Sequence, residues 1–399
     1  MKILVLNCGS SSIKYKLFEM TTKEILAQGG IEKIGLKGSF LKLTLPNGEK
    51  VILEKDIPEH TVGVEFIFQT LTSEQYGVLK SLEELDAVGH RMVHGGERFS
   101  QSVLLNKEAL DAVKACNDLA PLHNPANLKG VAAVSAILPN IPQVGVFDTA
   151  FHQTMPDYAY MYAIPYELYE KYGVRRYGFH GTSHRYVSKR VCEFLGINPE
   201  GTRIITCHVG NGGSVSAIKD GKCVDTSMGL TPLEGLMMGT RSGDIDAGAV
   251  TFIMEKEGLN PTGVSNLLNK KSGLLGISGV SSDMREIEDA VAAGNERAIL
   301  AQKIYFYRLR KYIGSYAAAM GGVDVIVFTG GVGENGKECR EHACEGLEFM
   351  GVKLDKALNE KTRGTETVIS TPDSKVKVVV IPTDEELMIA TDTMNLLDK

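Results

Sequence analysis

TRIITCHVGNGGSVSAIKDGKCVDTS, residues 202–227, contains short apolar segments separated by turns. Residues 203–209 and 214–218 are rich in β-branched and small apolar side chains, which predicts two strands joined by a Gly-rich turn. The Asp220-Gly221 pair that follows is typical of a tight hairpin and leads into a third strand. The segment therefore predicts a three-stranded antiparallel meander.

The N-terminus follows the same plan. Apolar runs at 2–6, 13–18 and 24–31 predict three strands, and Gly and Ser residues form the first turn. Two later segments also match each other, because the strands predicted in 143–151 and 377–386 both run directly into acidic residues. Helical segments, clearest at 283–320, separate the strands, so we expect α/β layers. The pattern predicts that the chain contains two copies of one unit.

The composition is that of a globular protein with more than one domain. The chain has 399 residues, of which 43% are hydrophobic and 23% charged. Its 49 acidic and 43 basic residues give a net charge of −6 without a Lys/Arg block, which argues against a nucleic-acid partner. The apolar N-terminal run is too short for a signal peptide, and no run is long enough for a membrane helix, so we expect a cytoplasmic protein with no membrane partner.

The seven cysteines are scattered and never spaced as C-x-x-C. This pattern favours buried or partly buried thiols in a reducing compartment over a disulfide framework or a metal site. No low-complexity linker marks a domain boundary, so a boundary near residue 150 is inferred from the repeat alone.

Gly-rich turns follow predicted strands at three places, namely CGSSS (8–12), GNGG (210–213) and GGVGENG (330–336). Such turns let a phosphate chain approach the backbone and offer N–H and O–H donors. A single turn of this kind is usually only a hairpin. Three turns, each after an apolar strand, favour a site for nucleotide phosphates.

The last turn also resembles two other nucleotide motifs. Gly331, Gly333 and Gly336 fit G-x-G-x-x-G, and Asp355 ends a possible next strand, as in nicotinamide-dependent oxidoreductases. The same turn matches most of a Walker A loop, but Glu338 occupies the position of the magnesium-binding hydroxyl. Neither motif accounts for the other two turns.

Two arginines and a histidine stand among glycines at predicted strand ends. Arg91 lies in GHRMVHGG, Arg241 in GTRSGDID and His180 in GFHGTSH. A guanidinium matches the geometry of carboxylate or phosphoryl oxygens, although each arginine could instead form an ordinary ion pair. His184 follows His180 by four residues, but no H-E-x-x-H motif or third ligand is visible, so we expect His184 to be structural.

Acidic residues follow the remaining strand ends. Asp148 follows one strand, and Asp384 to Glu386 follow another. Carboxylates beside phosphate loops suit Mg²⁺, a hard cation that prefers oxygen ligands. Helix capping is the alternative, and Asp283, with Glu286 three residues on, fits a capping box.

These motifs together resemble the acetokinase family from Met1 to the last twenty residues. The matching blocks are NCGSSSIKY, GHRMVHGG, APLHNP, VFDTAFHQTMP, YGFHGTSH, HVGNGGS, DTSMGLTPLEGLMMGTRSGDID, NKKSGLLGISG, FTGGVGEN and IPTDEEL. The resemblance implies an α/β fold of two duplicated actin-like (ribonuclease H-like) domains with a nucleotide cleft between them. It implies an acetate-side domain at 1–150, a nucleotide-binding and dimerising domain at 151–385, and a helix at 386–399 that packs back on the first domain.

The resemblance also implies an activity, namely reversible in-line transfer of the ATP γ-phosphoryl group to acetate, giving acetyl phosphate and ADP. Mg²⁺, or Mn²⁺, would be the cofactor, and the enzyme would be a homodimer. Propionate or another short-chain carboxylate is an alternative acceptor. A nicotinamide-dependent oxidoreductase and an actin-like assembly protein remain alternative functions.

The family's functional residues carry over to matching positions of this sequence. Those around the transferred group would be Asp148, Arg91, His180 and Arg241, and those around the acetate methyl Val93, Leu122, Phe179 and Pro232. The nucleotide would be bound by Lys14, His208, Val209, Gly210, Asn211, Gly212, Asp283, Met284, Arg285, Gly331, Val332, Gly333, Glu334 and Asn335, and the metal by Asn7 and Glu385. Cys8, Gly213 and Gly330 depart from the family pattern, each by a small-for-small replacement.

Overall fold

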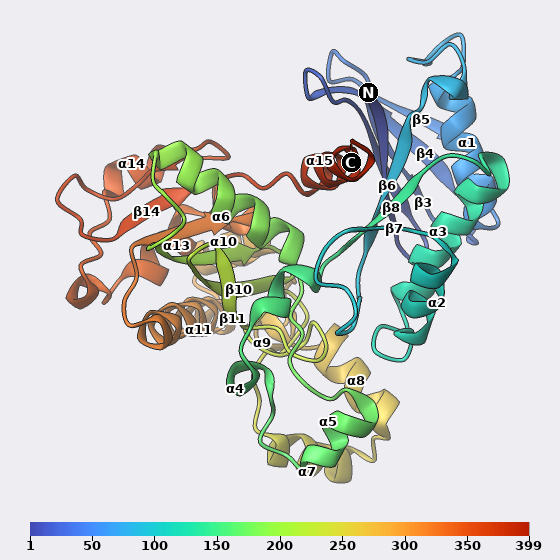
Figure 1. The fold of residues 1–399 in the computed structure, drawn as a ribbon. Coiled ribbons are helices and arrows are strands. Elements are labelled where there is room, and N and C mark those ends of the chain that lie inside the picture. Colours follow the sequence, from blue (N-terminus) through green and yellow to red (C-terminus); the bar gives the residue numbers. More distant parts are fainter. Residues whose placement is uncertain (399) are drawn as a thin grey trace. The chain divides into compact units, whose positions relative to one another are not determined.

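The computed structural model describes residues 1–398, which divide into two compact units. Unit 1 contains Met1–Gln153 together with the C-terminal residues from Asp384 onward, and unit 2 contains Thr154–Thr383. Each unit has one mixed β-sheet with helices packed on it (Figure 1).

The sheet of unit 1 has the strand order β5-β4-β3-β2-β1-β6-β8-β7. Its strands are β1 (Lys2–Cys8), β2 (Ile13–Glu19), β3 (Glu24–Glu32), β4 (Phe40–Thr44), β5 (Lys50–Glu54), β6 (Ala87–Met92), β7 (Val103–Leu104) and β8 (Gln143–Phe147). The first five strands form an antiparallel meander, whereas β1, β6 and β8 are parallel neighbours.

Helices cover both faces of this sheet. Leu4 and Leu6 of β1 share a core with α1 (His60–Leu71) and α3 (Asn124–Ile137), and α2 (Lys107–Ala115) packs on α3. Ile3 and Val5 point to the opposite face, because side chains alternate along a strand, and share a core with α15 (Glu385–Leu397). The short 3₁₀ turns of this unit are Leu82–Glu84 and Ala150–Thr154, the second of which ends at the first residue of unit 2.

The sheet of unit 2 has the order β11-β10-β9-β12-β14-β13. Its strands are β9 (Arg203–Val209), β10 (Gly213–Lys219), β11 (Lys222–Thr226), β12 (Val325–Thr329), β13 (Thr367–Val368) and β14 (Lys377–Val380). The pairing of these strands reproduces that of β3-β2-β1-β6-β8-β7 in unit 1, including a meander, two parallel pairs and a final antiparallel pair. The predicted duplication is confirmed.

The long helix α11 (Glu296–Met320) packs against β9 and β10 of this sheet, and α6 (Gly181–Leu195) packs against β9 and β12. The other helices are α4 (Asp157–Tyr160), α5 (Tyr166–Tyr172), α7 (Ala247–Glu257), α8 (Pro261–Lys270), α9 (Gly273–Ser278), α10 (Met284–Ala292), α12 (Gly330–Asn335), α13 (Lys337–Cys344), α14 (Lys356–Lys361) and a 3₁₀ turn at Glu348–Met350. Helix α11 contributes Tyr305, Leu309 and Ile313 to the hydrophobic core of unit 2.

Some local predictions were wrong. The N-terminal meander has two further strands, β4 and β5, and the helical segment at 283–320 is interrupted at Ala293 and Gly294 between α10 and α11. Asp355 does not end a strand, since it caps α14 and accepts a hydrogen bond from Leu358 N. Asp283 caps α10, but its own N–H donates to Ser281 Oγ, so Glu286 does not complete a capping box there.

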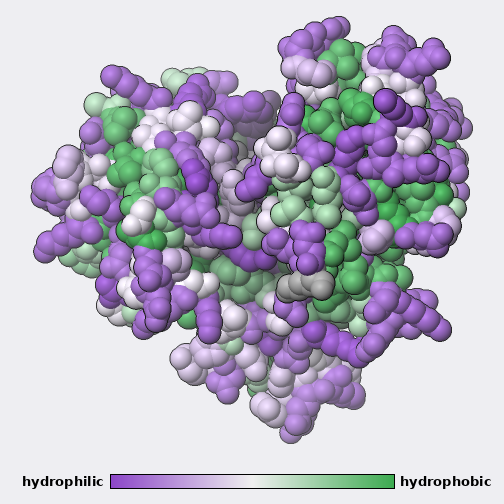
Figure 2. All heavy atoms as spheres, turned by 45° about the horizontal axis from the view of Figure 1, so that its top comes forward, coloured by the Kyte–Doolittle hydropathy of each residue, from purple (hydrophilic) through white to green (hydrophobic). Residues whose placement is uncertain are grey.

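On the face that Figure 2 shows, hydrophobic residues gather in several separate patches among hydrophilic ones. Within residues 1–398, no helix combines the length and the apolar character needed to cross a membrane.

Candidate functional site

Three sequence motifs of unit 2 meet at the turn between β9 and β10. This turn is closed by a hydrogen bond from Gly210 N to Gly212 O at 2.9 Å. A Cβ atom at Gly212 would lie 3.4 Å from Arg241 Nη2 and 3.7 Å from His180 Cε1. The guanidinium and the imidazole therefore lie beside a backbone kept accessible by glycine, which is a suitable environment for an anion.

His180 has a backbone conformation that side chains other than glycine seldom adopt. Its φ is +55°, and it immediately precedes α6. Such strain is characteristic of functional positions, because the surrounding structure must hold it. The ring stacks on His208 with centroids 4.2 Å apart, and its Nδ1 lies 2.9 Å from Ser214 Oγ.

His184 lies beneath these two rings and is fully buried. Its Nδ1 is 2.6 Å from Thr206 Oγ1 and its Nε2 is 2.7 Å from Ser214 Oγ. Both ring nitrogens therefore have hydroxyl partners within the core of unit 2, as a structural histidine requires.

Arg241 is partly buried, and burial lowers the pKa of its guanidinium. It donates from Nη1 to Pro232 O at 2.9 Å, and no ion pair with a carboxylate is found for it within residues 1–398. A desolvated cation held by a carbonyl rather than by a carboxylate keeps its charge for another anion.

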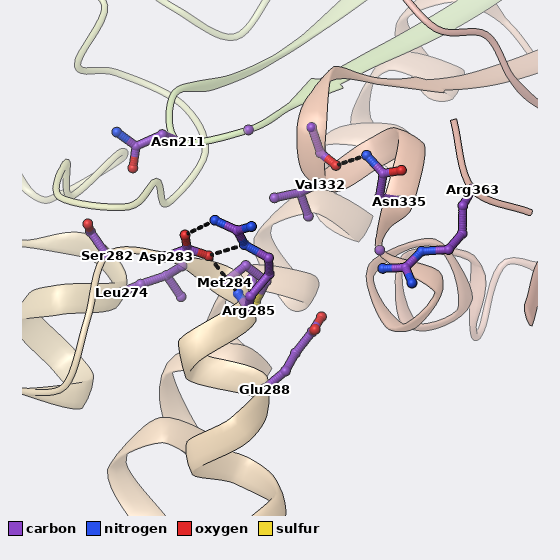
Figure 3. A pocket seen from close by; sticks show the side chains of 13 residues that line it. Asn211, Leu274, Ser282, Asp283, Met284, Arg285, Glu288, Val332, Asn335 and Arg363 are labelled. Carbon is purple, nitrogen blue, oxygen red and sulfur yellow. Dashed lines mark hydrogen bonds and ion pairs between the residues drawn. The ribbon is translucent and has the colours of Figure 1, made fainter. Parts of the chain in front are cut away.

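A cavity of about 630 Å³ adjoins the same turn (Figure 3). Its lining residues are Gly210, Asn211, Leu274, Ser282, Asp283, Met284, Arg285, Glu288, Gly331, Val332, Asn335, Gly336 and Arg363. The GNGG turn and α12 approach each other here, since a Cβ at Gly210 would lie 3.8 Å from Gly331 N.

The cavity combines apolar walls with polar groups at its edge. Leu274 and Met284 are buried, whereas Arg285 is exposed and forms two side-chain hydrogen bonds with Asp283, at 3.1 and 2.7 Å. The Arg285 guanidinium lowers the pKa of the Asp283 carboxyl, and burial raises the pKa of Glu288. The size and chemistry fit a flat heterocycle with a polar sugar.

Unit 1 contains a second cluster, which is formed by Arg91 at the end of β6 and Asp148 just after β8. Arg91 Nε donates to Asp148 Oδ1 at 3.1 Å and Nη2 donates to Oδ2 at 2.6 Å. Arg91 Nη1 also lies 3.4 Å from Asn7 Oδ1. The neighbouring Asp148 carboxylate raises the pKa of Arg91 further above its usual value, so the arginine stays charged.

Glu385, the first residue of α15, lies within electrostatic range of this ion pair. Burial raises its carboxyl pKa to about 7, and Arg91 acts in the opposite direction. A bound cation would stabilise the ionised form of this carboxylate. Asn7 and Glu385 both offer oxygen ligands. Within residues 1–398 no group of three or more His, Cys, Asp or Glu side chains is arranged to hold a metal ion.

The other predicted residues are divided between the units. In unit 1, Val93 is buried, Lys14 is exposed opposite Asn7 in the β1–β2 ladder, and Leu122 is 71% exposed. In unit 2, Phe179 is buried and Pro232 is partly buried. The remaining nucleotide-site candidates of unit 2 are His208 and Val209 in β9 and Gly333 and Glu334 in α12.

Sequence reasoning missed several side chains around these groups. Glu288 and Arg363 line the cavity, while Ser183, Ser214 and Thr383 contact the histidines or one another. Ser183, Ser214 and Thr383 lie inside motif blocks, which was the available signal, but spacing alone does not reveal which hydroxyl meets which ring.

Comparison with known proteins decides the family. A model of the acetokinase family matches residues 2–391. The chain belongs to this family. It is 82% identical to an acetate kinase of Bacteroides thetaiotaomicron over the full length of both chains. A crystal structure of Porphyromonas gingivalis acetate kinase matches with a TM-score of 0.97 and 66% identity, covering 99% of each chain.

A propionate kinase structure from Francisella tularensis matches with a TM-score of 0.92 and 44% identity, again covering 99% of each chain. The family makes this chain a kinase with a carboxyl group as acceptor and ATP or ADP as co-substrate. The oxidoreductase and assembly-protein alternatives are therefore wrong.

Proposed function

We propose that this chain catalyses reversible, direct in-line transfer of the ATP γ-phosphoryl group to acetate, giving ADP and acetyl phosphate. The observation that carries the proposal is the meeting of His180, Arg241 and the GNGG turn beside a nucleotide-sized cavity. High identity to acetate kinases supports acetate as the acceptor.

The chemistry requires positive charge more than proton removal. Acetate is already ionised near neutral pH, so its carboxylate can attack phosphorus without a general base. In phosphoryl transfer the protein mainly aligns the two partners and stabilises charge on the equatorial oxygens. In this proposal Arg91 binds the acetate carboxylate, and Arg241 and His180 donate to the moving phosphoryl group. Asp148 orients Arg91 through the two hydrogen bonds between them.

The nucleotide is proposed to occupy the cavity of unit 2. Leu274, Met284 and Val332 supply apolar contacts, which suit a base, and the backbone of the GNGG turn and α12 offers N–H groups to phosphates. His208 and Lys14 add side-chain donors to phosphate oxygens. Water must be excluded from the bound phosphates, because it otherwise competes with acetate for the phosphoryl group.

A divalent cation completes the proposal. Mg²⁺, or Mn²⁺ in its place, would be held through Asn7 and Glu385. The bound ion would offset the charge of the nucleotide phosphates. Burial raises the pKa of Glu385 to about 7, and a cation bound beside this carboxyl group would favour its ionised form.

The acetate methyl is proposed to contact Val93, Leu122, Phe179 and Pro232. One additional methylene changes binding by only about 1–3 kcal/mol, so propionate is the main competitor. Measuring kcat/KM for acetate, propionate and butyrate decides between them. A higher kcat/KM for propionate would replace acetate as the proposed acceptor.

A hydroxylamine trapping assay tests the activity directly. Wild-type protein with ATP, MgCl₂ and acetate should form acetyl hydroxamate, and Arg241→Ala should reduce kcat by about 100-fold, as expected for loss of a transition-state donor. Arg98→Ala is the matched control, because the Arg98 side chain is 65% exposed and its ion pair with the exposed Glu108, at 3.8 Å, lies outside the proposed site. Absence of hydroxamate with wild type, or an unchanged rate in Arg241→Ala, would refute the proposal.

We also propose that the enzyme is a cytoplasmic homodimer. Its free cysteines suit a reducing compartment. In residues 158–172 of unit 2, the exposed fractions of Tyr158, Tyr166 and Tyr172 are 86%, 59% and 57%. Exposed large apolar side chains in one segment are typical of protein–protein contact surfaces. Light scattering after gel filtration measures the mass, and a monomer at micromolar concentration would contradict the dimer.

A further inference from the structure

The hydroxyl of Ser183 lies between a histidine and a threonine that come from different elements of unit 2. Ser183 is in the first turn of α6 and is fully buried. Its Oγ is 2.7 Å from His208 Nδ1 and 2.8 Å from Thr383 Oγ1. His208 is the last polar residue of β9 before the GNGG turn, and its ring stacks on His180.

Thr383 is in turn hydrogen-bonded to Glu334 of α12. Its N–H donates to Glu334 Oε1 at 3.0 Å, and the same oxygen accepts from Gly330 N at 3.0 Å. The Glu334 carboxylate therefore turns back to the first residue of α12, which accounts for an acidic residue in a segment that is proposed to bind phosphates. Glu334, Thr383, Ser183 and His208 thus form a continuous hydrogen-bonded chain.

Two directions of donation are compatible with this chain, and they place the proton of a neutral His208 on different ring nitrogens. Ser183 has a single hydroxyl proton, and Thr383 has one more. When Thr383 donates to Ser183 and Ser183 donates to His208 Nδ1, a neutral His208 carries its proton on Nε2. Nε2 is on the side of the ring away from Ser183, and an N–H there is a donor for an anion. If His208 Nδ1–H instead donated to Ser183 and Ser183 donated to Thr383, the neutral His208 ring would carry a lone pair on Nε2. That lone pair would repel a phosphate oxygen.

The N-terminal end of α6 favours the neutral ring, because the positive end of a helix dipole disfavours a nearby cation. We propose that Ser183 is a positioning residue that holds His208 as an Nε2–H donor toward the nucleotide phosphates and, through Thr383, aligns this ring with α12. This inference rests on the proposed function in placing the phosphates at this turn.

Replacing Ser183 by Ala tests the role of the hydroxyl. The Ser183→Ala variant should bind MgADP about tenfold more weakly by calorimetry, because His208 loses the partner that orients it. The KM for ATP should rise in parallel, while the KM for acetate stays unchanged. Ser188→Ala is the matched control, since Ser188 is buried in the same helix and its hydroxyl donates within that helix, to Arg185 O at 3.1 Å.

Two outcomes would overturn the inference: MgADP affinity in Ser183→Ala equal to that of wild type, or an equal loss in Ser188→Ala. Calorimetry with ADP does not depend on acyl-phosphate formation. A wild type that makes no hydroxamate while Ser183→Ala still weakens MgADP binding would therefore refute the proposed function and support this inference.

Thr383 provides a second test. Thr383→Val removes the hydroxyl at nearly constant shape and should weaken MgADP binding by about threefold, since Ser183 keeps its bond to His208. Thr383→Ser should restore the affinity. Thr391→Val is the control, because Thr391 Oγ1 bonds only within α15, to Leu387 O at 2.7 Å. A loss in Thr383→Val that Thr383→Ser does not restore would contradict the hydroxyl chain.

The tautomer can be observed directly. Histidine-selective ¹⁵N labelling, with His208 assigned by comparison with His208→Ala, should show the proton of His208 on Nε2 in wild type. A proton on Nδ1 would overturn the proposed direction of the chain even if the binding results agreed.

Discussion

Arg91 and Asp148 are joined by two side-by-side hydrogen bonds, from Nε to Oδ1 and from Nη2 to Oδ2. Asp148 is almost completely buried, whereas the Arg91 side chain is 28% exposed. The paired geometry fixes the plane of the guanidinium and directs Nη1 toward Asn7 Oδ1. The buried Asp148 carboxylate therefore orients the Arg91 guanidinium, which remains accessible to a substrate.

This relationship predicts the effect of Asp148→Asn. The amide cannot accept both hydrogen bonds, so Arg91 loses its fixed orientation, and kcat should fall by about 100-fold. Steady-state kinetics should also show a raised KM for acetate. Arg91→Ala should lower kcat further, because the cation itself is lost.

The pH dependence of Asp148→Asn separates orientation from general-base catalysis. A carboxylate substrate has no proton to remove, so the kcat profile of the variant should parallel that of wild type between about pH 6 and pH 9. A missing pH-dependent limb in the variant would indicate that Asp148 transfers a proton.

Asp283 performs two separable tasks, namely capping α10 and holding Arg285. Asn caps helices about as well as Asp but lacks the charge, so Asp283→Asn should leave stability unchanged and raise the KM for ATP. Asp283→Ala should also lower the free energy of unfolding by about 1 kcal/mol through loss of the cap. Thermal unfolding and ATP kinetics measure the two effects, and equal destabilisation by both variants would contradict this separation.

Adding a methyl group should weaken ATP binding at Gly331 but raise the stability of the protein at Gly314. A Cβ at Gly331 meets no atom within 4 Å, and Gly331 lines the nucleotide cavity, so Gly331→Ala should fold normally and bind ATP about tenfold more weakly. Gly314 also has free space and lies in the middle of α11. Gly314→Ala should raise the free energy of unfolding by about 0.5–1 kcal/mol without changing activity. Unaltered ATP binding in Gly331→Ala would place the phosphates elsewhere.

His90 should make stability depend on pH. The ring is buried, it lies 2.7 Å from Gln143 Oε1, and desolvation lowers its pKa from 6.5 to about 4. The unfolded chain therefore binds a proton first as the pH falls, so the stabilisation is complete above pH 6.5 and is lost progressively toward pH 4. The full effect is about 3 kcal/mol.

Urea unfolding of wild type and His90→Asn at a series of pH values measures this contribution. The difference in unfolding free energy between the two proteins should shrink as the pH falls from 7 to 4. Parallel curves for the two proteins would show that His90 remains accessible to protons in the native state.

The thiols should be largely unreactive in the native protein. Cys116 is partly buried, while the other six cysteines are buried. Burial raises the pKa of Cys8, Cys339 and Cys344 to about 12, so little thiolate forms near neutral pH. An Ellman assay should show one fast thiol that is absent in Cys116→Ser, and the rest only after denaturation. Several fast thiols in Cys116→Ser would contradict the burial.

The sequence was sufficient for features that depend on local pattern. The strands predicted at 203–209 and 214–218 are observed at Arg203–Val209 and Gly213–Lys219, and a third strand follows the Asp-Gly turn as predicted, because apolar runs and an Asp-Gly turn specify strands and hairpins locally. The repeat of this pattern predicted the duplicated sheets. The buried or partly buried state of the cysteines was also predicted correctly from their scattered spacing.

Features that depend on distant contacts were not predictable in this way. The direction of the Glu334 side chain follows from Thr383, which is 49 residues away in the chain. The partnership of Ser183 with His208 likewise depends on how α6 packs against β9. Strands β4 and β5 were missed, although Pro46, Asn47 and Gly48 between them are turn formers, because β5 is a short edge strand whose side chains are exposed or only partly buried.

The position of α15 has a consequence for synthesis on the ribosome. Ile389 and Ala390 cover the face of β1 that presents Ile3 and Val5, so a sheet that is synthesised before unit 2 is completed by a helix that is synthesised after it. In the sequence, all of unit 2 comes between these two segments of unit 1. Unit 2 can therefore fold before α15 has been synthesised and has packed on the N-terminal sheet. Nascent chains that stop before Glu385 would therefore display an apolar surface, which is a natural recognition site for chaperones and proteases.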